Sequence, residues 1–173
     1  VIAYINKHNK KIWIMLRLKL KEHTLRTQRY YVFGIESRVI NKKILELRKN
    51  INIKKLGVHM HRKTQNVSEW NLKQEIVESL NKDVIKSIDF INIGGGIPSQ
   101  YKNITDTSLD YIFSKIKEIS EWTKSNNIQL IIEPGRFIAA PSVKLETKII
   151  GINDNTIIVD ASVYNSSLDT LIV

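Results

Sequence analysis

The chain contains no cysteine, only three prolines, and no apolar run of the roughly 18 residues that a membrane-spanning helix requires. Without cysteine, these residues cannot form a disulfide scaffold, a thiolate metal site or a catalytic thiol. The first ten positions contain polar residues too early for the apolar segment of a signal peptide. We therefore expect no membrane partner and a cytoplasmic location.

The length and composition indicate a folded piece of a larger protein. A chain of 173 residues has the size of one domain. Its 42% of hydrophobic and 25% of charged residues are typical of a globular chain. It begins with Val1 rather than methionine and ends on the apolar residues 171–173. We interpret it as a segment of a longer polypeptide.

Negative charge is scarce in the first third of the chain. Residues 1–63 hold 17 lysines and arginines and 3 acidic residues, whereas residues 64–173 hold 10 and 14. A basic half is compatible with nucleic-acid binding. However, the basic residues are scattered, and no aromatic residues alternate with them as they would on a surface that stacks bases. We favour an anionic small ligand, or simply solvated lysines, and disfavour nucleic acid as a partner.

Short apolar segments alternate with amphipathic ones before Pro141. Four segments have the character of buried strands, namely 12–20, 53–61, 88–93 and 128–132. Between them lie three helical patterns, the first over 38–49, and each can be capped by a hydroxyl residue at its start: Ser37, Ser68 and Thr107. This alternation predicts an α/β fold with parallel strands joined by helices.

The helical patterns also predict which side chains are buried. The apolar positions expected on the inner helix faces are Val39, Ile40, Ile44 and Leu47, then Leu72, Ile76, Val77 and Leu80, and finally Leu109, Ile112, Phe113, Ile116, Ile119 and Trp122. Asn126 and Asn127 are expected to end the last helix.

The pattern changes after Pro141. Residues 143–152 and 156–161 have strand character and are joined by Asn153-Asp154-Asn155, which is typical of a hairpin turn. No helical pattern follows. We predict a boundary here, with an α/β part over 1–141 and a β part over 142–173.

Chemically distinctive residues lie where the predicted strands end. Arg17 lies near the end of the first strand, His59 and His61 end the second, three glycines follow the third, and Glu133-Pro134-Gly135-Arg136 follows the fourth. Ligands of parallel α/β folds bind at the carboxyl ends of the strands. This recurrence predicts a binding site more strongly than any one motif does.

Each motif also has a plainer interpretation. Gly94, Gly95 and Gly96 suit a phosphate held by backbone N–H groups, but they can equally form a turn. Glu133 and Arg136 can hold separate groups of a ligand, or pair with each other. His59 and His61 face the same side of a strand and can stack on a flat aromatic ligand or be core histidines. A metal is the less favoured alternative, because no third ligand has suitable spacing.

In this order, the motifs resemble the fold-type III pyridoxal-phosphate decarboxylases, which act on ornithine, diaminopimelate or arginine. The matching segments are Gly-Val-His-Met-His-Arg-Lys-Thr-Gln (57–65), Ile-Asn-Ile-Gly-Gly-Gly-Ile-Pro (91–98), Glu-Pro-Gly-Arg-Phe-Ile-Ala-Ala (133–140) and Phe33-Gly34-Ile35. The resemblance implies the carboxyl-terminal part of a pyridoxal-phosphate-binding (β/α)8 barrel over 1–141, followed by the start of a β domain over 142–173.

The resemblance also implies roles for individual residues. His61 would stack on the pyridine ring, Glu133 would bind the ring nitrogen, and Arg17 would lie near the cofactor. The phosphate would be bound by the hydroxyl of Thr64, by Arg136 and by the amides of Gly94, Gly95 and Gly96. Pro134 and Gly135 would hold the turn between Glu133 and Arg136. Lys63 departs from the family, which usually has glycine there.

The implied reaction is the decarboxylation of a basic or diamino acid by a homodimer. The family's Schiff-base lysine lies on the first barrel strand, upstream of every match here, so no lysine of the chain is assigned that role. This gap motivates an alternative, a non-catalytic module that binds the cofactor or phosphate, or packs on a partner chain. A nucleic-acid binder is a third and less favoured hypothesis.

Overall fold

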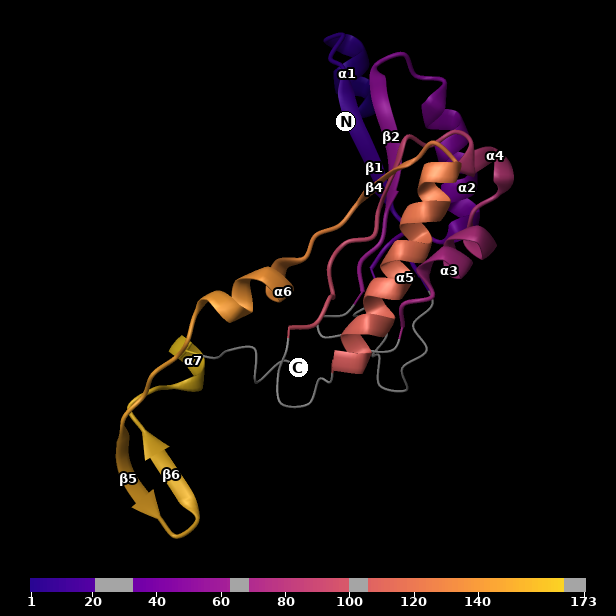
Figure 1. Cartoon of the computed structure of the whole chain (residues 1–173). Helices are drawn as coiled ribbons and strands as arrows, with labels where there is room; N and C mark the ends of the chain where they lie inside the picture. The colour runs from indigo at the N-terminus through magenta and orange to yellow at the C-terminus, as the bar shows by residue number, and fades with distance from the viewer. Residues whose placement is uncertain (21–32, 63–68, 100–105, 167–173) are drawn as a thin grey trace. The chain divides into compact units, whose positions relative to one another are not determined.

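The computed structural model describes residues 1–20, 33–62, 69–99 and 106–166, without the side chains of residues 106 and 107 (Figure 1). The chain divides into two compact units, Val1–Ile138 and Ala139–Val173. Thr64, the Ser68 cap and the side chain of Thr107 lie outside the described part. Among the described residues, no helix is both long enough and apolar enough to span a bilayer.

The first unit contains a four-stranded sheet in which every neighbouring pair is parallel. Its strands are β1 (Ile12–Arg17), β2 (Ile53–His59), β3 (Phe90–Asn92) and β4 (Gln129–Ile131), and they neighbour one another in sequence order. The parallel α/β prediction is therefore confirmed. The strands are shorter than their apolar segments because pairing stops where the chain turns away from the sheet.

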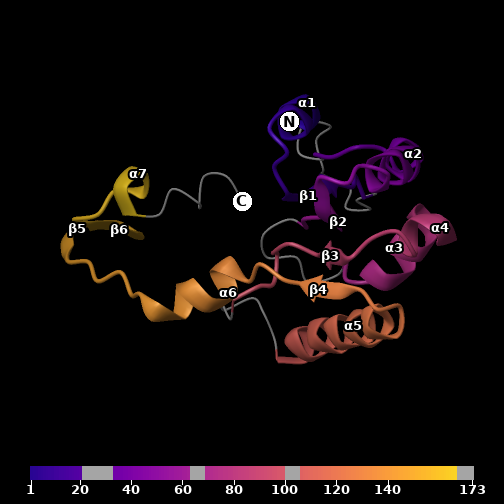
Figure 2. The ribbon, with the colours of Figure 1, turned by 90° about the horizontal axis from the view of Figure 1, so that it is seen from above.

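Helices occupy the connections between the strands. They are α1 (Ile2–Lys7) before β1, α2 (Ser37–Arg48) before β2, α3 (Leu72–Ser79) and α4 (Lys82–Ile85) before β3, α5 (Asp106–Ser125) before β4, and α6 (Gly135–Ala139) after it. Figure 2 shows α2, α3 and α5 along one side of the sheet. The strands are thus covered by helices on one face.

The core lies between these helices and the covered face of the sheet. Leu56, Val58 and Ile91 point into it from the strands and are fully buried, as are Ile40 and Ile44 of α2. The opposite face is more open, because Trp13 and Met15 of β1 are about half exposed. A single apolar layer therefore holds the unit together.

Three helix positions predicted as inward are wrong. Val39 is 42% exposed, Val77 47% and Phe113 43%, because each lies at the margin of its apolar stripe, beyond the residues that contact the sheet. Ser37 is also not the cap of α2: Glu36 holds that position, and no side chain caps the helix. The helices α1, α4 and α6 were not predicted, since each has six residues or fewer and is too short to show a periodic pattern.

The second unit contains an antiparallel hairpin of β5 (Ile149–Asn153) and β6 (Thr156–Val159). The predicted hairpin is confirmed, with Asp154 in the left-handed region at φ 49°. A 3₁₀ turn (Ala140–Ser142) precedes it and α7 (Val163–Ser166) follows, so the expectation of no further helix was wrong. α7 spans one turn and carries no pattern of its own.

Candidate functional site

The carboxyl ends of β1, β2 and β3 bring three polar side chains into one row. Arg17 is the register partner of His59, and His59 is the partner of Asn92. Partners in register project to the same face of a sheet. These side chains therefore lie on the face opposite the helices. Glu133 follows two residues after Ile131, the partner of Asn92 on β4, and continues the row.

Glu133 is the carboxylate of this cluster. Its Oε1 accepts a hydrogen bond of 2.7 Å from Nδ2 of Asn92. Its Oε2 lies 3.9 Å from Nδ1 of His61 and 4.0 Å from Nε2 of His59. Its backbone N–H donates to the carbonyl of Gly94 at 2.7 Å. The carboxylate is thus fixed in orientation, and its side chain is still 45% exposed, so a ligand can reach it.

The two histidines differ in environment. The side chain of His59 is 13% exposed, and its buried Nε2 has no hydrogen-bond partner among the residues that the structure describes. Burial lowers the pKa of His59, Glu133 opposes that shift, and the nearby charges of Arg17 and His61 add to it. His61 is more open, at 38% exposure, and its Nδ1 accepts a hydrogen bond of 3.3 Å from the N–H of Gly95. His61 therefore presents an imidazole to solvent beside Glu133.

The glycine loop packs closely against this cluster. Gly94 has φ 68° and Gly96 has φ 95°, a region that favours glycine. A Cβ on Gly95 would lie 2.7 Å from the carbonyl oxygen of Glu133 and 3.3 Å from Cε1 of His61. The amides of Gly94 and Gly95 donate to the side chains of Asn92 and His61. The loop can therefore lie this close to Glu133 and His61 only because glycine has no side chain.

The turn after β4 contains the other residues predicted for the site, Pro134, Gly135 and Arg136. The N–H of Gly135 donates to the carbonyl of Glu133 at 2.8 Å, and α6 begins at Gly135. Arg136 in α6 is partly buried. The structure thus gathers Arg17, His61, the glycines and Glu133 at the strand ends, with Pro134, Gly135 and Arg136 in the adjoining turn. Thr64 lies outside the described residues.

Sequence reasoning missed two contributors to the site. Asn92 was not singled out, although it directly precedes a buried residue and the three glycines. Phe33 was noted only as part of a motif, whereas its ring lies 5.6 Å from the guanidinium carbon of Arg17. Both contacts depend on segments far apart in the sequence.

The prediction that His59 and His61 lack a third metal ligand is wrong, because Glu133 lies beside them. One ligand atom from each of His59, His61 and Glu133 lies within 4.8 Å of the others. However, Nδ1 of His61 already accepts a hydrogen bond from the N–H of Gly95. Together, the carboxylate, imidazole, guanidinium and amide groups suit an anionic heterocycle at least as well as they suit a metal ion.

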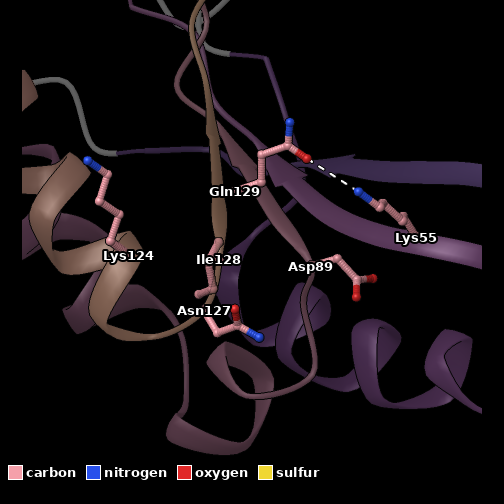
Figure 3. A pocket seen from close by; sticks show the side chains of 6 residues that line it. All are labelled: Lys55, Asp89, Lys124, Asn127, Ile128 and Gln129. Carbon is pink, nitrogen blue, oxygen red and sulfur yellow. Dashed lines mark hydrogen bonds between the residues drawn. The ribbon is translucent and has the colours of Figure 1, made fainter.

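A shallow hollow lies at the other end of the same strands. It is lined by residues from the amino ends of β2, β3 and β4 and the end of α5, namely Lys55, Asp89, Lys124, Asn127, Ile128 and Gln129 (Figure 3). Nζ of Lys55 donates a hydrogen bond of 3.4 Å to Oε1 of Gln129 across it. Because ligands of parallel folds bind at the carboxyl ends, we place the functional site at the row of Arg17, His59 and Asn92.

Comparisons with known proteins bear on this assignment. The family model described as "Pyridoxal-dependent decarboxylase, pyridoxal binding domain" matches residues 1–140. No match is found among curated protein sequences.

Among solved structures, the chain resembles carboxynorspermidine decarboxylase from Campylobacter jejuni at 19% identity and a TM-score of 0.63, over 99% of this chain and 44% of that one. It also resembles diaminopimelate decarboxylase from Helicobacter pylori, at 23% and 0.69 over 93% and 43%. The arginine decarboxylase of Paramecium bursaria Chlorella virus matches at 22% and 0.62, over 90% and 43%. The chain spans less than half of the length of these structures, and at such identities the likeness shows the fold.

Proposed function

The chain belongs to the family of pyridoxal-dependent decarboxylases, whose pyridoxal-binding domain its residues 1–140 match, and from this premise we propose that it binds pyridoxal 5′-phosphate for the decarboxylation of a basic or diamino acid. The cofactor of the family is pyridoxal phosphate. The observation that carries the proposal is the position of Glu133, held by Asn92 between two histidines at the strand ends.

The residues present fit this cofactor. Two buried polar atoms beside the site, Nε of Arg17 and Nε2 of His59, find no hydrogen-bond partner within the described part of the chain. Such atoms cost free energy unless a ligand or water satisfies them. A Cβ on Gly95 would clash with the carbonyl oxygen of Glu133 and crowd the ring of His61, so the loop can lie against these two residues only with glycine at this position. A carboxylate, an imidazole face and phosphate-binding groups match the ring nitrogen, ring and phosphate of the cofactor.

Each residue has a defined task in this proposal. When bound, pyridoxal phosphate supplies the electron sink for the carbanion left by the loss of CO₂. Glu133 holds a proton at the ring nitrogen, because a nearby carboxylate favours the charged form through attraction and a charge-assisted hydrogen bond. His61 offers its ring as a stacking surface. Arg136, the N–H of Gly96 and Thr64 bind the phosphate, because the N–H groups of Gly94 and Gly95 donate to Asn92 and His61.

We also propose that the four strands are the carboxyl-terminal part of a (β/α)8 barrel and that residues 142–173 begin a β domain. The sequential strand order supports a barrel segment, since a doubly wound sheet reverses order at a switch point. The helices α2, α3 and α5 along one side of the sheet agree with this assignment (Figure 2). The interior of such a barrel would be the face that carries Trp13 and Met15.

The test uses the protein with added pyridoxal phosphate. We expect visible absorbance from the bound cofactor and release of CO₂ from lysine, ornithine, arginine or diaminopimelate. Reduction with borohydride should attach the cofactor permanently to a lysine outside residues 1–173. Cofactor binding without a modified lysine or CO₂ release would instead support a non-catalytic module. Absence of cofactor binding would overturn the proposal, and salt-dependent binding to DNA or RNA would then favour the nucleic-acid alternative.

Glu133→Gln tests the role of the carboxylate. The amide cannot hold a proton at the ring nitrogen as a carboxylate does, so we expect decarboxylation to slow more than cofactor affinity falls. Glu46→Gln, on the exposed face of α2, is the matched control. Equal losses of rate and affinity would show that Glu133 is structural.

A homodimer in the cytoplasm completes the proposal. It rests on the family membership, because members of the family form active sites from two subunits. Sedimentation of the protein with and without cofactor tests it, and a monomer that is fully active would contradict it.

A further inference from the structure

Asn92 joins the two halves of the site. It ends β3, is 3% exposed, and accepts a backbone hydrogen bond of 2.8 Å from Met60 N–H at its carbonyl. We propose that Asn92 is a positioning residue that sets the carboxylate of Glu133 and the amide of Gly94 together. The inference rests on the proposed function, because it assigns Asn92 a task in that same site.

The amide side chain of Asn92 uses both of its ends. Nδ2 donates to Glu133 Oε1 at 2.7 Å, and Oδ1 accepts from the N–H of Gly94 at 2.8 Å. The reversed amide would point its oxygen at a carboxylate and its NH₂ at an N–H, which satisfies neither partner. The contacts therefore select one orientation of the side chain.

Glu133 depends on this contact for its direction. Among the residues that the structure describes, Asn92 is the hydrogen-bond partner of the Glu133 side chain. The histidine nitrogens at 3.9 and 4.0 Å are beyond hydrogen-bond distance. Because the carboxylate is nearly half exposed, it would sample other rotamers without Asn92. A hydrogen bond to a charged group is among the stronger ones.

Gly94 depends on Asn92 in a different way. Gly94 is the first residue of the glycine loop and has a φ of 68°. A Cβ at this position would clash with the carbonyl oxygen of Met60. The bond from Gly94 N–H to Asn92 Oδ1 spans two residues, as in an Asx turn. That turn alone would explain Asn92 as a plain loop-forming residue. The bond to Glu133 goes beyond the turn, and a variant can separate the two.

Asn92→Asp keeps the acceptor for Gly94 and removes the donor for Glu133. It places two carboxylates side by side, so that the pair retains a proton to higher pH than Glu133 alone would. We expect kcat to fall roughly 10- to 100-fold, the loss of one charge-assisted bond, with KM within about twofold. The acidic limb of the pH–kcat profile should move to higher pH, and the affinity for pyridoxal phosphate should change little.

Asn92→Ala removes both bonds. We expect a similar fall in kcat without the displaced acidic limb, together with weaker binding of pyridoxal phosphate. Asn126→Asp, on an exposed residue after α5, is the control and should match the wild type. An Asn92→Asp variant with wild-type kcat and pH profile would overturn the inference.

The double variant Asn92→Asp/Glu133→Gln provides a measurement that does not depend on activity. It exchanges the amide and the carboxylate, so the hydrogen bond forms again in the reverse direction. We expect the cofactor-free protein to regain the thermal midpoint lost in Asn92→Asp, while kcat stays low. A midpoint no higher than that of Asn92→Asp would contradict direct coupling. Failure of the wild type to bind pyridoxal phosphate would instead refute the proposed function.

Discussion

Gly57 and Phe90 are register partners on β2 and β3, and the Phe90 ring occupies the space that a side chain at Gly57 would need. A Cβ there would lie 2.5 Å from Cε2 of Phe90 and 2.6 Å from its carbonyl oxygen. Phe90 is 4% exposed. The glycine thus leaves space for the Phe90 ring against β2, two residues before the pair of His59 and Asn92.

We expect Gly57→Ala to destabilise the protein by about 1–3 kcal/mol, because the overpacked ring and strand must both shift. Urea denaturation with a constant m-value measures the loss. Gly151→Ala is the control, since its Cβ would lie 3.6 Å from Ile158, an ordinary contact. Equal free energies of unfolding for the two variants would show that Phe90 has room to move.

His59 makes stability depend on pH. Burial lowers its pKa below the ordinary value of 6.5, so the unfolded chain takes up a proton before the folded one does. The free energy of unfolding should therefore fall as pH decreases below about 6.5. His59→Gln should flatten that slope. A slope of the opposite sign between pH 5 and about 6.5 would contradict a lowered pKa.

The charge of Glu133 counteracts this shift. Glu133 raises the pKa of His59, although burial outweighs it. Glu133→Gln removes the attraction and should lower the pKa of His59 further, which NMR titration of the imidazole can measure. Glu46→Gln, which removes an exposed carboxylate of α2, is the control and should leave the pKa of His59 unchanged.

The sequence predicted the strands and the residues at their ends, because a buried parallel strand leaves a local apolar run followed by turn residues. His59, Gly94 and Glu133 lie, as the sequence predicted, at or just after the carboxyl ends of β2, β3 and β4. The sequence did not predict the task of Asn92, which arises from register between β3 and β4. That register joins residues 41 positions apart and leaves no local pattern.

The helix faces were predicted less accurately at their margins. Periodicity identified Ile40 and Ile44, which are fully buried, but it does not limit the width of an apolar stripe. Phe113 shows the reason, since its ring packs edge-on to Phe137 at 5.6 Å. Phe137 belongs to α6, a helix too short to be predicted, so the partner of Phe113 could not be anticipated.

Gly95 provides a test of the cofactor site. In Gly95→Ala the new Cβ would press against the Glu133 carbonyl and the His61 ring. We expect the affinity for pyridoxal phosphate to fall at least tenfold, a loss of about 1.4 kcal/mol, as measured by absorbance titration. Gly151→Ala should bind as the wild type does. Unchanged affinity in Gly95→Ala would remove the glycine loop from the site.

Arg62 connects the site to the helices. It directly follows His61, its side chain is 1% exposed, and it forms ion pairs with Glu75 of α3 and, at 3.7 Å, with Glu69. A buried guanidinium is stable only when its charge is compensated, and the acids depend on it equally. The position of His61 is therefore tied to α3 through its neighbour.

We expect Arg62→Met to destabilise the protein by about 3 kcal/mol, because it removes the cation that pairs with two mostly buried carboxylates. Arg62→Met/Glu75→Gln should recover part of that loss, since it removes the charge as well as its partner. Lys43→Ala breaks an exposed pair with Glu46 on α2 and should cost no more than about 0.5 kcal/mol. Denaturation of the four proteins at one pH measures all three differences. If the single and double variants at Arg62 were equally destabilised, lost packing rather than the lost ion pair with Glu75 would be the cause.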